Sequence, residues 1–319
     1  MIVIAFGPVP SRRLGRSLGI NNIPPKICSY SCVYCQLGRT DQMQIRRQAF
    51  YEPHLILQAA RAKVAAVRRA GETVDYLAFV PDGEPTLDIH LGREIAQLRQ
   101  LDIPIAVISN ASLIGRPDVR QDLAGADWVS LKFDAVDEPT WLRVNRPHRS
   151  LDLDSIHGGA LKFASVFRGE LVTETMLVAG VNDGEVHLRA LANYLGRLQP
   201  SVAYLSIATR PPAEDWVRIP GEAVLNQAFQ ILSAKVPRVE YLVGYEGDAF
   251  AFTGDVEEDL LSITAVHPMR KEAVGVFLAR AGAGWATVRH LVADGQLVET
   301  EYGGHTFYLR SLNPRYRAA

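Results

Sequence analysis

Cysteine is scarce in this chain, and its placement is unusual. Only three cysteines occur among 319 residues, and Cys28, Cys32 and Cys35 all fall within eight positions. An odd, tightly clustered set makes a poor disulfide framework, because disulfides pair cysteines two by two. The pattern indicates thiolate ligands, which a reducing compartment would preserve.

Long apolar runs and an excess of one charge are also absent. No stretch approaches the roughly 18 apolar residues of a membrane helix, and the apolar start at residues 1–5 is too short for a signal-peptide core. With 34 basic and 35 acidic side chains, the formal charge is −1. No global positive field therefore favours nucleic acid. Because neither a targeting signal nor a membrane helix is visible, we expect a cytoplasmic protein without a membrane partner.

The composition that remains is that of a folded protein. Hydrophobic residues make up 48% and charged residues 22%, near the averages for globular chains. The length corresponds to about two domains. These values exclude a disordered or fibrous protein.

From about residue 16 to residue 250, short apolar runs alternate with amphipathic stretches such as residues 53–69. This alternation predicts parallel strands joined by right-handed helical crossovers. The expected strands cover residues 17–21, 75–80, 105–109, 128–133, 171–178, 203–208 and 239–243. Six or seven such units predict an α/β fold, as a partial or full barrel or as a doubly wound open sheet.

The last quarter of the chain follows a different pattern. Three helices and a hairpin are expected there, at residues 255–265, 270–281, 285–293, 297–302 and 305–309. Gly303 and Gly304 suit a two-residue hairpin turn. The order is typical of a winged helix-turn-helix, so we expect a boundary near Gly254, with domains at residues 1–254 and 255–319.

The spacing of the cysteines suits an iron–sulfur cluster. In Cys28-x3-Cys32-x2-Cys35, three thiolates can hold three irons of a [4Fe–4S] cluster and leave one iron without a protein ligand. An open metal position distinguishes a catalytic site from a closed structural one. The alternative is a zinc site, which needs a fourth ligand; the histidine nearest in sequence is His54.

The residue before the last cysteine, Tyr34, completes a motif that resembles the signature of a known family. With Tyr34 as the aromatic, Cys-x3-Cys-x-aromatic-Cys resembles the signature of radical S-adenosylmethionine (SAM) enzymes. The resemblance implies that the open iron binds the amino and carboxylate groups of SAM. It also implies that the reduced cluster cleaves the C5′–S bond and that a 5′-deoxyadenosyl radical abstracts a hydrogen atom from substrate. The implied fold is a partial (β/α)6 TIM-like barrel, in agreement with the alternation of strands and helices.

A second motif follows the second expected strand. Asp82-Gly83-Glu84-Pro85 resembles the Gly-Gly-Glu motif of that family, with Asp82 in place of the first glycine. The resemblance implies that this segment holds the SAM amino group, largely through backbone carbonyls. The same residues alone predict an ordinary turn. Their position at the end of the strand after the cysteine loop favours the SAM-binding role.

Polar residues also mark the third and fourth expected strands. Ser109 and Asn110 end the third, whereas Ser130, Lys132 and Asp134 alternate along the fourth and share one face. The resemblance implies that Lys132 supplies a positive charge for the SAM carboxylate, as in glycyl-radical activases. It places Ser130 and Asp134 near the ribose hydroxyls. The alternative is an edge strand with a solvated face.

The fifth and sixth expected strands end in further candidates. Val181 and Asn182 resemble the family region where backbone approaches the adenine, although Asn182 and Asp183 could equally cap the next helix. Arg210 follows the sixth strand, in a Pro-rich segment whose alternative interpretation is a rigid turn. Because every motif follows a strand, all are expected at the carboxyl-terminal mouth of a barrel, where barrel enzymes place their sites.

The segments around the cysteines narrow the resemblance. Residues 7–20 and 26–38 resemble a group of Fe–S oxidoreductases placed beside the wyosine-tRNA synthases, and the resemblance extends into the expected winged helix. Wyosine synthases bind a second cluster through additional cysteines. Since this chain has no fourth cysteine, a second cysteine-ligated [4Fe–4S] cluster is excluded. The implied cofactors are one [4Fe–4S] cluster and SAM, and the substrate stays open.

Five arginines are candidate substrate ligands, namely Arg12, Arg13, Arg143, Arg146 and Arg210. Each lies near an expected strand end or in an adjacent loop, and arginine suits bidentate capture of carboxylate or phosphate. The alternative for each is a surface ion pair. No residue is assigned as a radical relay, general acid or general base.

Three functions are consistent with these features. The first is a radical SAM enzyme that acts on a small molecule, peptide or protein and takes electrons from a flavodoxin- or ferredoxin-type partner. The second is a radical SAM enzyme that modifies tRNA or another RNA. The third is an Fe–S redox sensor that regulates transcription through the winged helix.

The third function is the least favoured. Residues 256–319 contain seven basic and seven acidic side chains, so this region is neutral and DNA binding is not expected. A sensor also has no need of three features found together here, namely the turn at residues 82–84, the polar row of Ser130, Lys132 and Asp134, and Asn182. For the C-terminal region we favour a role as a peptide- or protein-binding module or as a lid.

Overall fold

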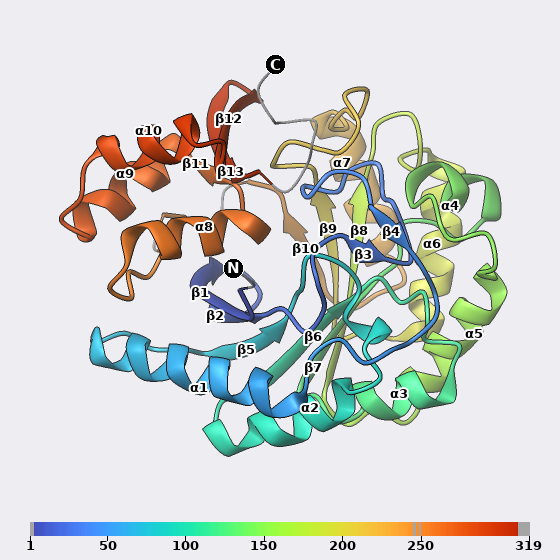
Figure 1. Ribbon diagram of the computed structural model, residues 1–319. Helices are drawn as coiled ribbons and strands as arrows, with labels where there is room; N and C mark the ends of the chain where they lie inside the picture. The colour runs from blue at the N-terminus through green and yellow to red at the C-terminus, as the bar shows by residue number, and fades with distance from the viewer. Residues whose placement is uncertain (1–2, 245–246, 249, 312–319) are drawn as a thin grey trace.

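An eight-stranded sheet forms the centre of the computed structural model, which describes residues 3–244, 247–248 and 250–311 (Figure 1). Seven neighbouring strands run parallel, and the first strand pairs antiparallel with the second. In spatial order the strands are β1 (Ala5–Ser11), β2 (Gly15–Ile20), β5 (Tyr76–Phe79), β6 (Ile105–Ser109), β7 (Trp128–Lys132), β8 (Glu170–Leu177), β9 (Val202–Ile207) and β10 (Val239–Leu242).

Helices follow most of the parallel strands and cover the outer face of the sheet (Figure 1). They are α1 (Pro53–Arg69), α2 (Leu91–Leu98), α3 (Pro117–Leu123), α4 (Glu138–Val144), α5 (Leu153–Ala164), α6 (Glu185–Leu198) and α7 (Glu222–Ser233). Short elements complete this part, namely β3 (Ile27–Cys28), β4 (Gln42–Met43) and the 3-10 turns at Pro85–Leu87 and Arg99–Leu101.

Helix α1 illustrates why these segments become helices. Pro53 occupies the first turn, where its missing N–H costs no hydrogen bond. Ile56, Ala60, Val64 and Val67 are buried at intervals of three or four residues, so one stripe faces the sheet. The sequence pattern therefore sets both the start and the orientation of the helix.

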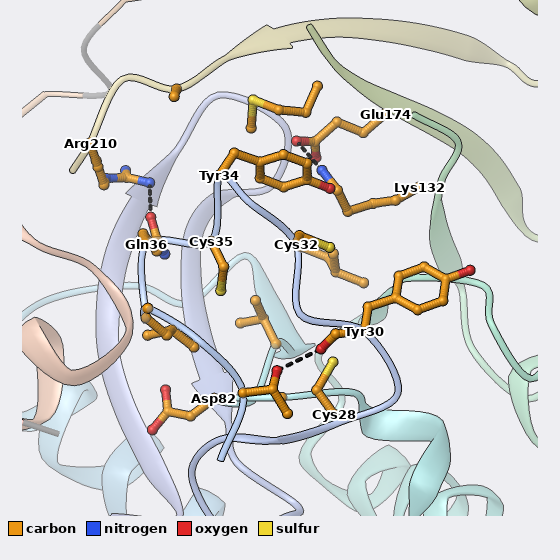
Figure 2. A pocket seen from close by; sticks show the side chains of 18 of the residues that line it. Cys28, Tyr30, Cys32, Tyr34, Cys35, Gln36, Asp82, Lys132, Glu174 and Arg210 are labelled. Carbon is orange, nitrogen blue, oxygen red and sulfur yellow. Dashed lines mark hydrogen bonds and ion pairs between the residues drawn. The ribbon is translucent and has the colours of Figure 1, made fainter. Parts of the chain in front are cut away.

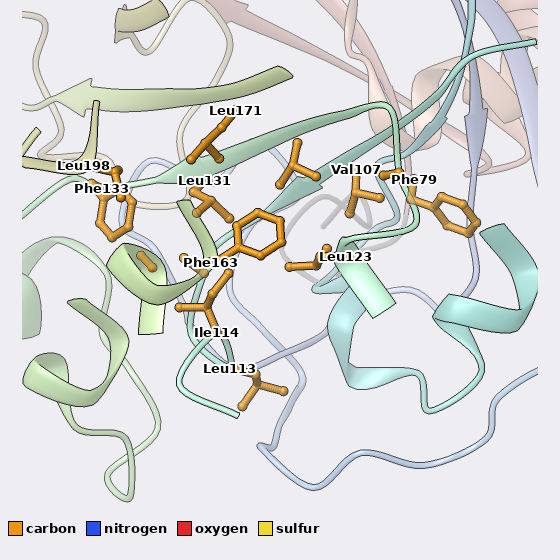
Figure 3. Packing of buried hydrophobic residues seen from close by; sticks show 14 of the residues in the cluster. Phe79, Val107, Leu113, Ile114, Leu123, Leu131, Phe133, Phe163, Leu171 and Leu198 are labelled. Atoms are coloured by element: carbon orange, nitrogen blue, oxygen red, sulfur yellow. The ribbon is translucent and has the colours of Figure 1, made fainter. Parts of the chain in front are cut away.

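The main hydrophobic core lies between the sheet and these helices (Figure 3). Phe79 and Leu131 from the strands and Phe163 from α5 are fully buried in it. Each such side chain contributes about 1.5–3 kcal/mol through burial. This outer layer therefore supplies most of the apolar stabilisation and holds the strand ends in place.

A smaller cluster lines the inner face of the curled sheet. It takes one residue or more from each of β5 to β10, including Trp128, Val172 and Leu242. Leu14, from the β1–β2 turn, joins the same cluster. In that turn Arg12 donates to the carbonyl of Val243, just beyond the last strand, at 3.2 Å. The two edges of the sheet therefore approach each other, as curvature into a half-barrel requires.

The expected strands are all present, with ends that differ by at most two residues. Strand β1 was not among the expected strands, and its Pro8 and Pro10 are residues that disfavour a strand interior. An edge strand tolerates proline, since one of its sides lacks a neighbour to accept hydrogen bonds. The first strand of the sheet is thus Ala5–Ser11, and the segment expected at residues 17–21 is the second.

The C-terminal module, defined as residues 255–311, contains the elements expected there and one short strand more. In order they are α8 (Val256–Val266), β11 (Met269–Arg270), α9 (Lys271–Arg280), α10 (Trp285–Ala293), β12 (Leu297–Tyr302) and β13 (His305–Arg310). The three strands form their own sheet in the order β11-β13-β12. Leu260, Phe277 and Leu291 pack in a separate hydrophobic cluster with Phe250.

No helix in the described ranges has both the length and the apolar character needed to cross a membrane.

Candidate active site at the cysteine loop

Cys28, Cys32 and Cys35 line one pocket of about 300 Å³ at the carboxyl-terminal ends of the parallel strands (Figure 2). The pocket wall also contains Asp82 and Gly83, from the loop after β5, and Lys132, the last residue of β7. Residues more than 100 positions apart thus face the same space. The geometry suits a ligand held between the cysteine loop and the sheet.

Backbone hydrogen bonds join the cysteine loop to the loop after β5. Lys26 N–H donates to the carbonyl of Asp82 at 2.6 Å, and Glu84 N–H donates to the carbonyl of Ile27 at 3.2 Å. Between them, a Cβ on Gly83 would lie only 1.9 Å from the Ile27 oxygen. Glycine is therefore required for the two backbones to approach so closely.

Two asparagine side chains direct amide N–H groups at cysteine sulfur atoms. Nδ2 of Asn110 lies 3.5 Å from Sγ of Cys28, and Nδ2 of Asn145 lies 3.4 Å from Sγ of Cys32. Asn110 was a sequence candidate, whereas Asn145, at the end of α4, was not. Nothing in the local sequence around Asn145 distinguishes it from an ordinary helix-end residue.

Burial makes all three thiols poor acids in the absence of metal. Burial, together with the charge of Asp134, raises the pKa of Cys32 to about 12. The pKa values of Cys28 and Cys35 are also raised, chiefly by burial. Because metals bind the thiolate, binding at this site must displace protons.

These residues fit a [4Fe–4S] cluster. The three thiols face one pocket, and two amide N–H groups are placed to donate to sulfur, a contact that tunes such clusters. In the described part of the chain, no three His, Cys, Asp or Glu side chains are grouped to hold a single metal ion. A cluster has no such requirement, because each thiolate binds its own iron.

Glu84 ties the loop after β5 to the end of β6. Its carboxylate accepts hydrogen bonds from the hydroxyls of Thr86 and Ser109 and from the backbone N–H groups of Thr86 and Asn110. Burial raises the pKa of Glu84 despite these hydrogen bonds. Pro85 begins the 3-10 turn that follows. Glu84 and Ser109 thus position the loop, and neither is part of the pocket lining.

A buried ion network forms the opposite wall of the pocket. Oε1 of Glu174 lies 3.0 Å from Nζ of Lys132, and its other oxygen pairs with Arg13. Ser206 donates to Oε1 of Glu174 at 3.1 Å. Burial opposes ionisation of Glu174, but Lys132 and Arg13 outweigh it and lower the pKa of this carboxyl. Glu174 was missed because it lay within the apolar run of an expected strand.

Lys132 also lies 5.1 Å from the ring centroid of Tyr34, within range of a cation–π contact. The Tyr34 hydroxyl donates to Asp134, whose Oδ2 also accepts from Asn145 at 2.7 Å. Oδ1 of Asp134 accepts from the backbone N–H of Met176. Asp134 is therefore buried where the cysteine loop, α4 and β8 meet.

Ser130, two residues before Lys132, is buried in β7, and its hydroxyl has no hydrogen-bond partner in the structure.

Asn182 braces the end of β8. Its side chain accepts from Val178 N–H and donates to the carbonyls of Asp134 and Met176, all at 2.8 Å. The alternative of a helix cap is wrong: Gly184 is the N-cap residue of α6, and no side chain caps it. Val181 belongs to the same turn and donates its N–H to Val178.

Asp82 stands where the family motif has glycine, and it is buried. Its Oδ1 has no hydrogen-bond partner in the structure. Burial raises the pKa of Asp82 to about 7, although the charge of Arg310 opposes this rise. An unsatisfied carboxyl oxygen in a pocket is a candidate contact for a bound cationic group.

The five candidate arginines separate into two groups. Arg13 and Arg210 line the pocket. The other three contact protein elsewhere: Arg12 binds carbonyls after β10, Arg143 donates to the carbonyl of Gly180, and Arg146 pairs with Glu214. Of the five, the structure therefore places Arg13 and Arg210 in the pocket wall, and Arg146 contacts the cysteine loop only through its backbone carbonyl, which accepts from Ser31 N–H at 3.2 Å.

Comparison with known families accounts for this arrangement. Residues 22–192, more than half of the chain, match the family described as the radical SAM superfamily. The chain belongs to the radical SAM superfamily. The domain implies a [4Fe–4S] cluster and SAM, and the chain is an enzyme whose particular reaction is not specified by this membership.

Two relatives resemble the radical SAM chain over much of its length. UPF0026 protein MJ1312 of Methanocaldococcus jannaschii is 44% identical over 316 residues, covering 98% of each chain. A UPF0026 protein of Helicobacter pylori strain J99 is 34% identical over 240 residues, covering 74% of this chain and 76% of the relative.

Solved structures agree with the fold. TYW1 with a lysine-pyruvate adduct bound has a TM-score of 0.53 at 18% identity, over 69% of this chain and 74% of that one. A radical SAM methyltransferase from Sphaerobacter thermophilus also has a TM-score of 0.53 at 18% identity, over 72% of this chain and 67% of that one. These likenesses confirm the curled half-barrel over the doubly wound open sheet.

Proposed function

We propose that this enzyme uses one [4Fe–4S] cluster and SAM to abstract a hydrogen atom from a small molecule, peptide or protein. The observation that carries the proposal is the gathering of three thiols, the loop containing Gly83 and the Lys132–Glu174 pair around one pocket. When bound, the cluster and SAM supply 5′-deoxyadenosyl radical chemistry. A flavodoxin- or ferredoxin-type partner is the proposed source of electrons.

The chain's own residues have separate roles in this proposal. Cys28, Cys32 and Cys35 hold three irons, and the unsatisfied Oδ1 of Asp82 is placed to accept from a bound ammonium group. Lys132 is held in position by Glu174, so its charge stays at the pocket wall for a ligand carboxylate. Arg13 and Arg210 are the proposed contacts for an anionic substrate.

Reductive cleavage of SAM tests the proposal. The full chain is loaded with iron and sulfide under anaerobic conditions, reduced with dithionite and mixed with SAM, and 5′-deoxyadenosine is measured. Wild-type protein is expected to form it, and Cys32→Ala is expected to lose both the cluster absorbance and the product. Asn193→Ala, on the exposed side of α6, is the matched control. A wild-type chain that holds a cluster yet never cleaves SAM would overturn the proposal.

RNA modification is the second candidate, favoured by the likeness in fold to TYW1. Deuterium transfer discriminates the two candidates, because hydrogen abstraction moves label from a deuterated substrate into 5′-deoxyadenosine. Label from deuterated tRNA would favour the second candidate, and label from deuterated metabolites or peptides the first. Tight operator binding without SAM cleavage would instead indicate the transcription regulator.

We also infer that residues 1–254 and 255–319 are separate domains and that residues 255–311 form a winged helix; residues 312–319 lie outside the described part of the chain. The order α8, β11, α9, α10, β12 and β13 supports this assignment, as does a hydrophobic cluster drawn mainly from these elements. A cytoplasmic location is inferred as well, because a reducing compartment preserves thiolate ligands.

A further inference from the structure

The C-terminal module contacts the rim of the pocket at two backbone carbonyls. The side-chain amide of Gln36 donates to the carbonyl of Val266, the last residue of α8. The hydroxyl of Tyr302, the last residue of β12, donates to the carbonyl of Ala208 at 2.8 Å. Gln36 and Ala208 both line the pocket. Two elements of the module, a helix end and the hairpin, therefore lie at the mouth of the site.

A third contact joins the same rim to a buried histidine. Arg210, which lines the pocket, donates from Nη1 to Oε1 of Gln36 at 3.0 Å (Figure 2). Its Nη2 lies 3.0 Å from Nε2 of His267, directly after α8. Burial and the charge of Arg210 lower the pKa of His267, so its ring is neutral and accepts from the guanidinium. The rim and the module thus share one hydrogen-bonded chain.

Ion pairs with buried carboxylates fix the module to the other side of the half-barrel. Lys63, on α1, donates to Oδ1 of Asp259, on α8, at 2.6 Å. Glu72, just after α1, pairs with both Arg16 and Arg280, the last residue of α9. The module is therefore held at two separate places, and its contacts at the rim do not depend on one side chain.

We propose that the C-terminal module forms an outer wall behind the rim residues Gln36, Ala208 and Arg210 and restricts access to the pocket to a small molecule or an extended chain segment. The identity of the substrate in this inference rests on the proposed function. The contacts between the module and the rim are independent of that function. The cavity of about 300 Å³ lies at the lower end of the range for ligand pockets, roughly 300–1,000 Å³, and the proposed cofactors would share this space with the substrate. With the hairpin against the rim residue Ala208, we expect a folded protein or an RNA duplex to be kept from the cysteines.

Thiol labelling tests this wall directly. All three cysteines of the chain line the pocket, so any alkylated thiol reports access to it. The full-length, metal-free chain is treated with iodoacetamide or with a bulky poly(ethylene glycol) maleimide, and each rate is normalised to that of free cysteine. Wild-type protein is expected to react with the small reagent and to exclude the bulky one.

Two variants weaken the wall at independent contacts. Tyr302→Phe removes one hydroxyl, and His267→Phe removes the acceptor for Arg210. Each is expected to increase bulky labelling about fivefold, which corresponds to one net hydrogen bond, and to leave iodoacetamide labelling unchanged. Arg289→Ala, at an exposed position of α10 in the same module, is the matched control and is expected to change neither rate.

Three results would overturn the proposal. The first is bulky labelling of the wild type at the rate of the small reagent, and the second is no acceleration in either variant. The third is an equal acceleration with both reagents, because a wall discriminates by size. The labelling assay uses no iron, SAM or reductant, so its result is independent of SAM cleavage. A protein that fails to cleave SAM can still exclude the bulky reagent, and a protein that cleaves SAM can still admit it.

Discussion

Nδ2 of Asn145 lies 3.4 Å from Sγ of Cys32, although 113 positions separate the two residues in sequence. Asn110 has the same relationship to Cys28, at 3.5 Å. Hydrogen bonds to cysteine sulfur stabilise the more negatively charged state of a cluster, and so raise its reduction potential. In the proposed function, the two amides would therefore favour a cluster that accepts an electron.

Asn145→Ala is expected to lower the reduction potential of the reconstituted cluster. Loss of one N–H to sulfur contact of about 1 kcal/mol corresponds to a shift of about 40 mV for a one-electron step. Potentiometric titration followed by electron paramagnetic resonance measures it. Asn193→Ala, at an exposed position of α6, serves as control. An unchanged potential in Asn145→Ala would remove the amide from this role.

Gly83→Ala is expected to destabilise the fold by about 1–3 kcal/mol, because the new Cβ would overlap the Ile27 oxygen and backbone must move. Gly158→Ala is the matched control: it lies in α5, has no atom within 4 Å of the added Cβ, and is expected to be neutral or mildly stabilising. Urea unfolding of both variants gives the comparison. Equal stability of the two variants would contradict the steric argument.

Glu174→Gln is expected to lower the free energy of unfolding by about 3–5 kcal/mol near neutral pH, since Lys132 and Arg13 lose their buried counter-ion. The pKa of Glu174 is lowered in the folded state. Its stabilisation is therefore present above the unfolded pKa and is lost as pH falls, so the gap between variant and wild type should narrow in acid.

Urea unfolding at several pH values measures this gap. Glu185→Gln is the control, because Glu185 forms an exposed pair with Arg189 within α6, and such pairs contribute little. A gap for Glu174→Gln that stays constant from neutral to acidic pH would show that the charge of Glu174 is not the source of its effect.

Glu94→Gln should have the opposite pH dependence. Burial, with the charge of Asp88, raises the pKa of Glu94 to about 9. Between its unfolded and folded pKa values the native state holds the extra proton, so wild-type stability falls by about 1.4 kcal/mol per pH unit. The variant lacks this proton and is expected to gain stability relative to wild type as pH rises.

Urea unfolding from about pH 6 to 8 tests the difference between the two proteins. The buried Asp82 and Asp88 also titrate near neutral pH, but they are common to both proteins and largely cancel. Wild type and Glu94→Gln with parallel pH profiles would indicate that Glu94 is ionised in the folded protein.

Periodicity was sufficient to predict most of the fold. Apolar runs such as Ile105–Ser109 are strands because both faces of a central parallel strand are buried. Strand β1 was missed for a physical reason: the prolines that argue against a strand are tolerated at a sheet edge. Periodicity could not distinguish a half-barrel from an open sheet, because both folds have the same alternation of strands and helices.

The candidate site was predicted in part. The cysteine spacing and the loop containing Gly83 are local patterns, and the structure places them in one pocket. Glu174 and Asn145 carried no such signal. Glu174 is buried within a strand only because Lys132 and Arg13 compensate its charge.

The sequence by itself predicted the three cysteines as ligands, gave the order of strands and helices and excluded a second cysteine-bound cluster. Only the tertiary structure decided which polar groups face the pocket and where the C-terminal module lies. The contact between Arg210 and His267 illustrates the reason. Local propensity acts over a few residues, whereas such a contact depends on how separate elements pack and on which buried polar groups then find partners.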